Sequence, residues 1–183
     1  MKIAIFGGTF DPFHIGHLAI TKAAADKFGT VYVVPTICNY YREDKRYLFT
    51  FDEKCTIIRQ MICNLDNVMI DPIEKDKDSK WRTINTIEYF KKIHPEDELH
   101  FIVGEDSYKN FKTWFRYEDI LNLCNLVVVQ RGDEESLVKD PEIPCEELYI
   151  GKDFVESSSS KVREKLIQEL MDMYLSDRIW YNF

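Results

Sequence analysis

The chain has 183 residues, of which 45% are apolar and 31% are charged, and its formal net charge is −8. This length and composition predict one globular domain, residues 1–183, with a helical C-terminal part from about residue 155. The acidic charge argues against a nucleic-acid partner, because such binding relies on many lysine and arginine contacts to phosphates.

Apolar runs rich in β-branched residues alternate along the chain with helical patterns. The runs predict five buried strands, at 2–6, 31–34, 68–71, 99–103 and 126–130. Helical patterns lie between them, at 15–28, 51–65, 84–93 and 117–123. This alternation predicts an α/β fold, a doubly wound parallel sheet with helices on both faces, in which ligands bind beyond the carboxyl ends of the strands.

The first strand and the first helix are joined by a segment rich in glycine and histidine, "GGTFDPFHIGH" at 7–17. Gly7 and Gly8 let a ligand approach the backbone, but neither a Walker loop nor a Gly-x-Gly-x-x-Gly pattern is present. His14 and His17 share one face at a helix start, where unpaired N–H groups and the helix dipole attract anions. We therefore interpret the segment as a phosphate site.

The residues alone leave two other interpretations of His14 and His17 open. The imidazoles could cap or pack the start of the helix. They could also form a His-x-x-His metal pair, but no third ligand stands at a metal-site spacing, so we expect no metal bound by the protein itself.

Three further stretches do not fit the framework of strands and helices, at 36–50, 104–114 and 154–163. In the last of them, serines precede a helical pattern and are good N-caps. Arg163 puts a cation in the first turn of that helix, where it opposes the helix dipole unless an anion binds. The run "EKDKDSK" at 74–80 is interpreted as a solvated loop without function.

The sequence also predicts where the protein resides. No apolar run approaches the roughly 20 residues that span a bilayer, and no basic segment followed by a cleavable apolar one begins the chain. We expect a cytoplasmic protein without a membrane partner. Five cysteines without a Cys-x-x-Cys pair suggest neither a disulfide framework nor a zinc knuckle. The oligomeric state stays open.

The opening motif closely resembles the signature of the nucleotidyltransferases with a His-x-Gly-His motif, which transfer AMP or CMP to a phosphate acceptor. The resemblance implies a Rossmann-like fold, with both histidines acting on the triphosphate, and Mg²⁺ bound mainly through the ATP phosphates. "SSSKVR" at 158–163 is similar to the element that holds the ATP β- and γ-phosphates in this family. The implied ATP-binding residues are Gly7, Gly8, Thr9, Phe10, His14, His17, Ser158, Ser159, Ser160 and Arg163.

Two internal segments, "WRTINT" at 81–86 and "GEDSYKNFKTW" at 104–114, resemble those that frame the pyridine nucleotide in nicotinate (nicotinamide) mononucleotide adenylyltransferases. An indole can stack on an electron-poor pyridinium ring. The resemblance therefore implies ATP and nicotinate mononucleotide as substrates, with deamido-NAD and pyrophosphate as products. The implied acceptor-binding residues are Thr83, Thr86, Gly104, Asp106 and Trp114. Asn39, Arg42 and Arg131 are further candidates for the acceptor, Arg131 because it follows the fifth predicted strand at the ligand-binding edge.

One segment departs from that family. After Pro35 the family usually reads Pro-x-x-x-Pro-Pro-His-Lys, whereas this chain has "PTICNYYR", which keeps a cation at Arg42 but lacks the later prolines and the histidine. Two alternatives therefore stay open. One is adenylyl or cytidylyl transfer to another phosphate acceptor, such as nicotinamide mononucleotide or phosphopantetheine, and the other is a nucleotide-binding regulator without turnover.

Overall fold

The computed structural model describes residues 1–37, 47–77, 80–131, 139–150 and 158–180, with the backbone alone at 131 and 170–180. In this part of the chain, six strands form one parallel sheet in the order β3-β2-β1-β4-β5-β6. The strands are β1 (Lys2–Gly8), β2 (Thr30–Pro35), β3 (Val68–Ile70), β4 (Glu98–Gly104), β5 (Asn125–Arg131) and β6 (Cys145–Ile150). The predicted doubly wound α/β fold is confirmed.

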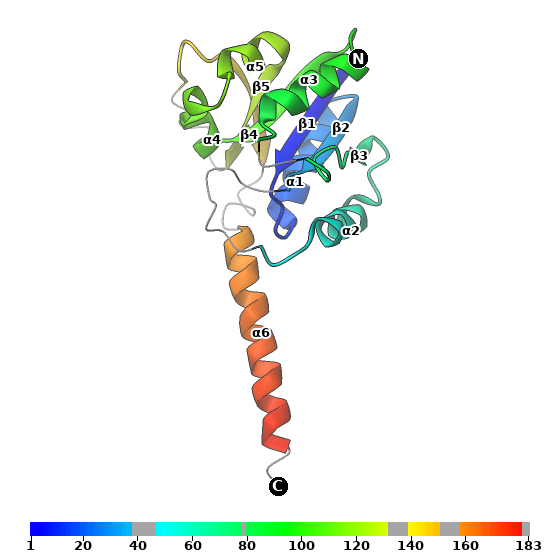
Figure 1. Cartoon of the computed structure of the whole chain (residues 1–183), viewed down its shortest axis with the longest axis vertical. Coiled ribbons are helices and arrows are strands. Elements are labelled where there is room, and N and C mark those ends of the chain that lie inside the picture. The colour runs from blue at the N-terminus through cyan, green and yellow to red at the C-terminus, as the bar shows by residue number, and fades with distance from the viewer. Residues whose placement is uncertain (38–46, 78–79, 132–138, 151–157, 181–183) are drawn as a thin grey trace.

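Helices cover both faces of the sheet (Figure 1). α1 and α2 pack on one face, and α3, α4 and α5 pack on the other. The last helix, α6, extends away from the sheet (Figure 1). None of the helices in the described ranges is long and apolar enough to cross a membrane. The helices are α1 (Ile15–Lys27), α2 (Phe51–Ile62), α3 (Thr83–Ile93), α4 (Glu105–Lys109), α5 (Tyr117–Leu123) and α6 (Ser159–Trp180), with a 3-10 turn η1 (Phe111–Thr113).

The central strand shows why its sequence is apolar throughout. Ala4 and Phe6 of β1 point into the core beneath α1, whereas Ile3 and Ile5 point into the core on the opposite face. A strand buried on both sides reads as a continuous apolar run rather than as an alternation. This is the pattern from which the strands were predicted.

Two parts of the fold differ from the prediction. β6 was not predicted, because its sequence "CEELYI" contains two glutamates, and an edge strand keeps part of its surface in water. The stretch 104–114, expected to lie outside the framework, contains α4 and η1. These elements are too short for the helical period to be visible in the sequence.

The strand order determines where a ligand can bind. From β1 the chain passes to β2 and β3 on one side, and then returns to β4 on the other side of β1. In doubly wound sheets this reversal leaves a crevice at the carboxyl ends of the two central strands. The segment with the two histidines directly follows β1 at this edge.

Candidate active site

A cavity of about 200 Å³ opens at the carboxyl ends of the central strands. It is lined by the turn after β1, by the start of α3 and by aromatic side chains around β4. The lining residues are Gly7, Gly8, Thr9, Val34, Thr36, Glu74, Trp81, Arg82, Thr83, Thr86, Phe101, Trp114 and Phe115. The cavity thus brings together two sets of predicted residues, the glycine turn and the threonines with Trp114.

The turn after β1 is held close to the end of β2. The carbonyl of Gly8 accepts a hydrogen bond from the N–H of Thr36 (2.8 Å). A Cβ atom at Gly8 would lie 2.7 Å from the Phe10 ring, so this close approach requires glycine. Phe10 is 2% exposed and has a φ of 45°. Its side chain therefore belongs to the core, and a ligand at this position can meet only the backbone.

His14 and His17 lie at the start of α1, as the sequence predicts. His14 is the N-cap, and its Nδ1 accepts the N–H of Gly16 (3.1 Å), while Nδ1 of His17 accepts the N–H of His14 (3.2 Å). When Nδ1 accepts, a neutral imidazole carries its hydrogen on Nε2. The capping interpretation is therefore confirmed for His14.

The two imidazole rings are stacked, with centroids 3.7 Å apart and an interplanar angle of 28°. The edge of the Phe10 ring lies against His17, with centroids 4.9 Å apart. The aromatic packing and the two backbone hydrogen bonds together fix the orientation of the pair.

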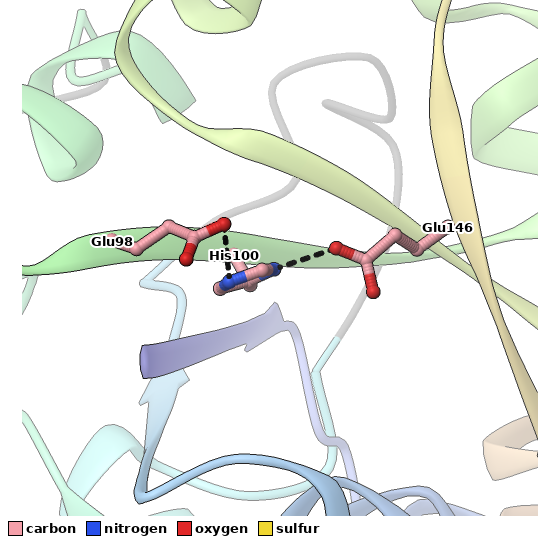
Figure 2. A group of neighbouring side chains, drawn as sticks. All are labelled: Glu98, His100 and Glu146. Atoms are coloured by element: carbon pink, nitrogen blue, oxygen red, sulfur yellow. Dashed lines mark ion pairs between the residues drawn. The ribbon is translucent and has the colours of Figure 1, made fainter. Parts of the chain in front are cut away.

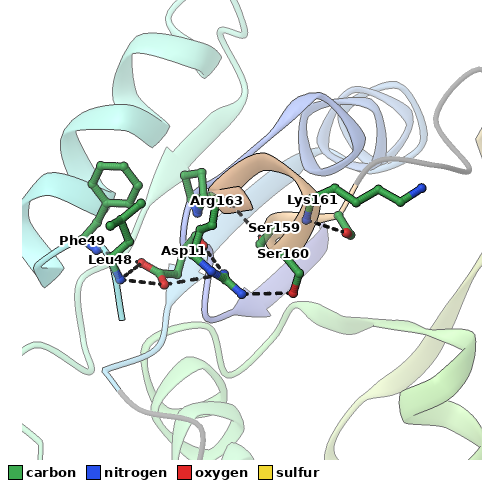
Figure 3. A network of polar contacts seen from close by, with 9 residues as sticks. Asp11, Leu48, Phe49, Ser159, Ser160, Lys161 and Arg163 are labelled. Carbon is green, nitrogen blue, oxygen red and sulfur yellow. Dashed lines mark hydrogen bonds and ion pairs between the residues drawn. The ribbon is translucent and has the colours of Figure 1, made fainter. Parts of the chain in front are cut away.

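Arg163 reaches the histidine segment from the far end of the chain (Figure 3). Its Nη1 donates to the carbonyl of Asp11 (2.5 Å) and lies 3.6 Å from the Asp11 carboxylate, while Nη2 donates to Oγ of Ser160 (3.0 Å). Ser159 donates to the carbonyl of Pro12 (3.1 Å). The start of α6 is thereby fixed beside the start of α1.

Asp11 is the centre of this network. Its buried carboxylate also accepts the N–H groups of Leu48 (3.0 Å) and Phe49 (2.9 Å), which precede α2 (Figure 3). Ser158 accepts the N–H of Lys161 (3.2 Å), so the predicted serine cap of α6 is confirmed. One carboxylate thus joins three segments that are distant in sequence.

The opposite wall of the cavity is aromatic and polar. The Trp114 ring is half-buried and stands edge-on to Phe101, with centroids 6.2 Å apart. Thr86 accepts a hydrogen bond from Nε1 of Trp81 (2.8 Å) and donates one to Glu74 (3.0 Å). These contacts occupy the Thr86 hydroxyl within the wall.

Glu74 corrects the interpretation of 74–80 as a solvated loop without function. Its carboxyl group lines the cavity and bonds to Thr86, and burial raises its pKa to about 7. The neighbouring Lys75 and Asp76 are exposed, as expected. Glu74 turns inward from this charged run, and no local signal in the sequence distinguishes it from its neighbours. Trp81, Arg82, Phe101 and Phe115 are further lining residues that the sequence did not single out.

Two predicted acceptor residues within the described ranges, Gly104 and Asp106, do not line the cavity. Gly104 is the N-cap of α4, and Asp106 is exposed in the first turn of that helix. Arg131 is the last residue of β5, and the structure describes only its backbone. Asn39 and Arg42 lie outside the described residues. The assignment of these residues to the acceptor stays a prediction.

Within the described ranges, no group of three metal-ligating side chains includes His14 or His17. The one such group there is Glu98, His100 and Glu146, at the opposite end of the sheet.

Comparisons with known proteins agree with the geometry of the site. The cytidylyltransferase-like family model matches residues 5–165. A probable nicotinate-nucleotide adenylyltransferase from Fusobacterium nucleatum is 32% identical over 171 residues, which cover 91% of this chain and 88% of the relative. One from Pelobacter propionicus is 36% identical over 143 residues, which cover 77% of this chain. The chain spans 65% of the length of that second relative.

A solved structure shares the fold. The nicotinic acid mononucleotide adenylyltransferase of Plasmodium falciparum, complexed with NaAD, superposes with a TM-score of 0.68 at 19% identity. The match covers 89% of this chain and 82% of that one. At this identity the likeness supports the Rossmann-like α/β fold.

Proposed function

This chain belongs to the cytidylyltransferase-like family and, within it, to the nicotinate-nucleotide adenylyltransferases, and we propose that it joins ATP and nicotinate mononucleotide to give deamido-NAD and pyrophosphate. The observation that carries the proposal is the continuity of the cavity, which extends from the Gly7–Gly8 turn to Trp114. A nucleotide phosphate along the turn and a pyridinium ring against the indole would share this one space. With ATP as the donor, we expect the reaction in the cytoplasm.

The reaction needs positioning rather than a covalent intermediate. An oxygen of the acceptor phosphate bonds to the α-phosphorus of ATP as the bond from that phosphorus to the oxygen bridging to the β-phosphate breaks. Pyrophosphate leaves with the electron pair. Because the acceptor phosphate is already ionised, no side chain has to remove a proton, and the protein contributes by aligning the two substrates and stabilising the charge that develops.

We assign that stabilisation to His14 and His17. The Nδ1 hydrogen bond of each ring fixes the orientation of that ring, which would aim its Nε2–H at the phosphates, and donors held in advance require little reorganisation in the transition state. Arg163 and the serines at 158–160 are assigned to the leaving pyrophosphate. Gly7, Gly8, Thr9 and the backbone of Phe10 are assigned to ATP, because they lie at the carboxyl end of β1, between the sheet and the start of α1.

The nucleotide is proposed to enter as its Mg²⁺ complex. Asp11, a carboxylate beside the proposed phosphate site, already accepts two backbone N–H groups and faces Arg163. The described residues there provide no oxygen cage for the ion, so the triphosphate and water would hold it.

The acceptor is assigned to the wall opposite the glycine turn. Trp114 would contact the pyridine ring, and Arg82 puts a guanidinium at the cavity, where it could pair with the carboxylate that distinguishes nicotinate from nicotinamide. Thr83 and Thr86 shape the same wall. Asn39, Arg42, Gly104, Asp106 and Arg131 are proposed for the remainder of the acceptor.

The experiment that tests the proposal measures pyrophosphate release from ATP and Mg²⁺ with nicotinate mononucleotide, nicotinamide mononucleotide and phosphopantetheine offered separately. We expect a strong preference for the nicotinate compound. Trp114→Leu should raise KM for that compound and leave KM for ATP unchanged, since the indole lies on the acceptor side. Activity with a different acceptor would overturn the acceptor assignment. If no pyrophosphate is released with any of the three compounds although ATP binds, a regulator without turnover would be favoured.

A further inference from the structure

A second group of polar side chains lies at the end of the sheet opposite the cavity. His100 of β4 is 0% exposed, and Figure 2 shows its ring between the carboxylates of Glu98 and Glu146. Nε2 lies 3.4 Å from Glu98 Oε1, and Nδ1 lies 3.3 Å from Glu146 Oε1. Glu98 begins β4 and Glu146 lies near the start of β6, so the group bridges β5 from both sides.

The hydrogen-bonding capacity of the His100 imidazole is not used by its surroundings. Among the described residues, neither ring nitrogen makes a hydrogen bond. A neutral imidazole has one N–H and one lone pair. Whichever nitrogen carries the hydrogen, the other turns a lone pair toward a carboxylate oxygen, and this contact is unfavourable unless a cation lies there.

The Phe28 ring covers the imidazole of His100, with centroids 4.6 Å apart. A metal ion would bind through the lone pair of one ring nitrogen, and the other nitrogen would keep its hydrogen and donate it to the carboxylate on its side.

We propose that Glu98, His100 and Glu146 bind a divalent transition-metal ion of the zinc class. A tetrahedral zinc ion with bonds of about 2.0–2.1 Å holds its donor atoms about 3.3 Å apart, which matches the distance from either ring nitrogen to the carboxylate oxygen beside it. One ion uses only one of the two nitrogens. One ligand atom from each residue already lies within 4.8 Å of the others. The glutamate side chains are 49% and 37% exposed, so they can turn onto the ion, and water can complete its coordination.

The donor set favours zinc over magnesium, because imidazole suits zinc and its neighbours, whereas magnesium prefers oxygen ligands throughout. Neighbouring side chains also hold the two carboxylates in place. Lys27 binds Oε2 of Glu146 (2.8 Å), and Asn125 donates to Oε1 of Glu98 (2.7 Å). Such contacts hold ligands in place around a metal. Lys27 also opposes a cation nearby, so we expect moderate rather than extreme affinity.

The ion would join β4 to β6 across β5, beneath the C-terminal end of α1. Helix C-termini carry partial negative charge, which favours a cation. The site lies at the amino ends of the strands, away from the cavity, so we infer a stabilising role rather than a catalytic one. This inference does not rest on the proposed function.

The test is a Zn²⁺ titration of the full, untagged chain after chelator treatment, followed by calorimetry and by thermal unfolding. It uses the His17→Ala background, so that the stacked imidazoles at the other end of the sheet do not bind zinc as a pair. Glu98→Gln and Glu146→Gln change half-exposed side chains and should fold. Glu96→Gln is the matched control, because it removes the same charge at an exposed position next to the group. Co²⁺ replaces Zn²⁺ in a second titration followed by visible absorption.

We expect Zn²⁺ to bind and to raise Tm, because a ligand of the native state stabilises it. Glu98→Gln and Glu146→Gln should each weaken binding at least about tenfold, the lower end of what is lost when groups supporting a metal site are removed. Glu96→Gln should bind as the background does. Equal affinity in all variants, or no binding at micromolar Zn²⁺, would overturn the proposal.

Discussion

His14 both caps α1 and stands in the proposed phosphate site, and two substitutions separate these roles. His14→Ala removes the side chain that accepts the Gly16 N–H. Loss of an N-cap costs about 1 kcal/mol, within a range of about 0.5–2 kcal/mol. His14→Asn places a side-chain oxygen at the same position, and asparagine is among the best N-caps. The asparagine variant should therefore be about as stable as the wild type, and the alanine variant about 1 kcal/mol less stable.

The two variants should differ in stability but not in turnover. Both variants lack the Nε2–H donor, and removal of one fixed donor to a transition-state oxygen lowers kcat by about 10²–10³. His14→Asn should thus be stable but slow. The free energy of unfolding is measured in urea by circular dichroism, and kcat and KM for ATP are measured by pyrophosphate release.

Two results would refute this reasoning. A wild-type kcat in His14→Asn would show that the imidazole does not act on the phosphates. An unchanged urea midpoint in His14→Ala would show that the cap does not stabilise the protein. The expected change corresponds to a shift in Tm of roughly 2–4 °C for a domain of this size, which is readily measured.

Three other predictions concern buried groups. Asp11→Asn should lower the free energy of unfolding by about 2–4 kcal/mol, because a buried carboxylate that accepts two N–H groups and faces a guanidinium is lost; urea unfolding checks this, and the exposed Asp26→Asn should change little. The native pKa of Glu74, about 7, lies above the ordinary value of 4.5, so its contribution to stability is complete below pH 4.5 and is lost as pH rises through 7. The wild type should lose on the order of 2–3 kcal/mol over this interval relative to Glu74→Gln, and parallel stability curves would contradict the assignment. Burial raises the pKa of Cys124 to about 12, so iodoacetamide at pH 8 should label the exposed Cys63 and spare Cys124 in peptide mass spectra.

Much of the framework and the motifs could be predicted because their signals are local. Buried strands show as apolar runs, and the serine cap of α6 depends on contacts within one turn of the helix. The histidine pair is recognisable for the same reason, since its backbone contacts span three residues or fewer. β6 was missed because glutamates interrupt its apolar pattern.

The residue pattern was enough to predict the class of fold, the order of most elements and a candidate phosphate segment. Which distant side chains meet became visible only in the folded chain. Arg163 reaches Asp11 across 152 positions, Glu74 turns from a charged run into the cavity wall, and His100 lies between carboxylates from two separate strands. These contacts follow from the strand order and from the packing of helices on the sheet, which depend on the whole core rather than on any short stretch of residues.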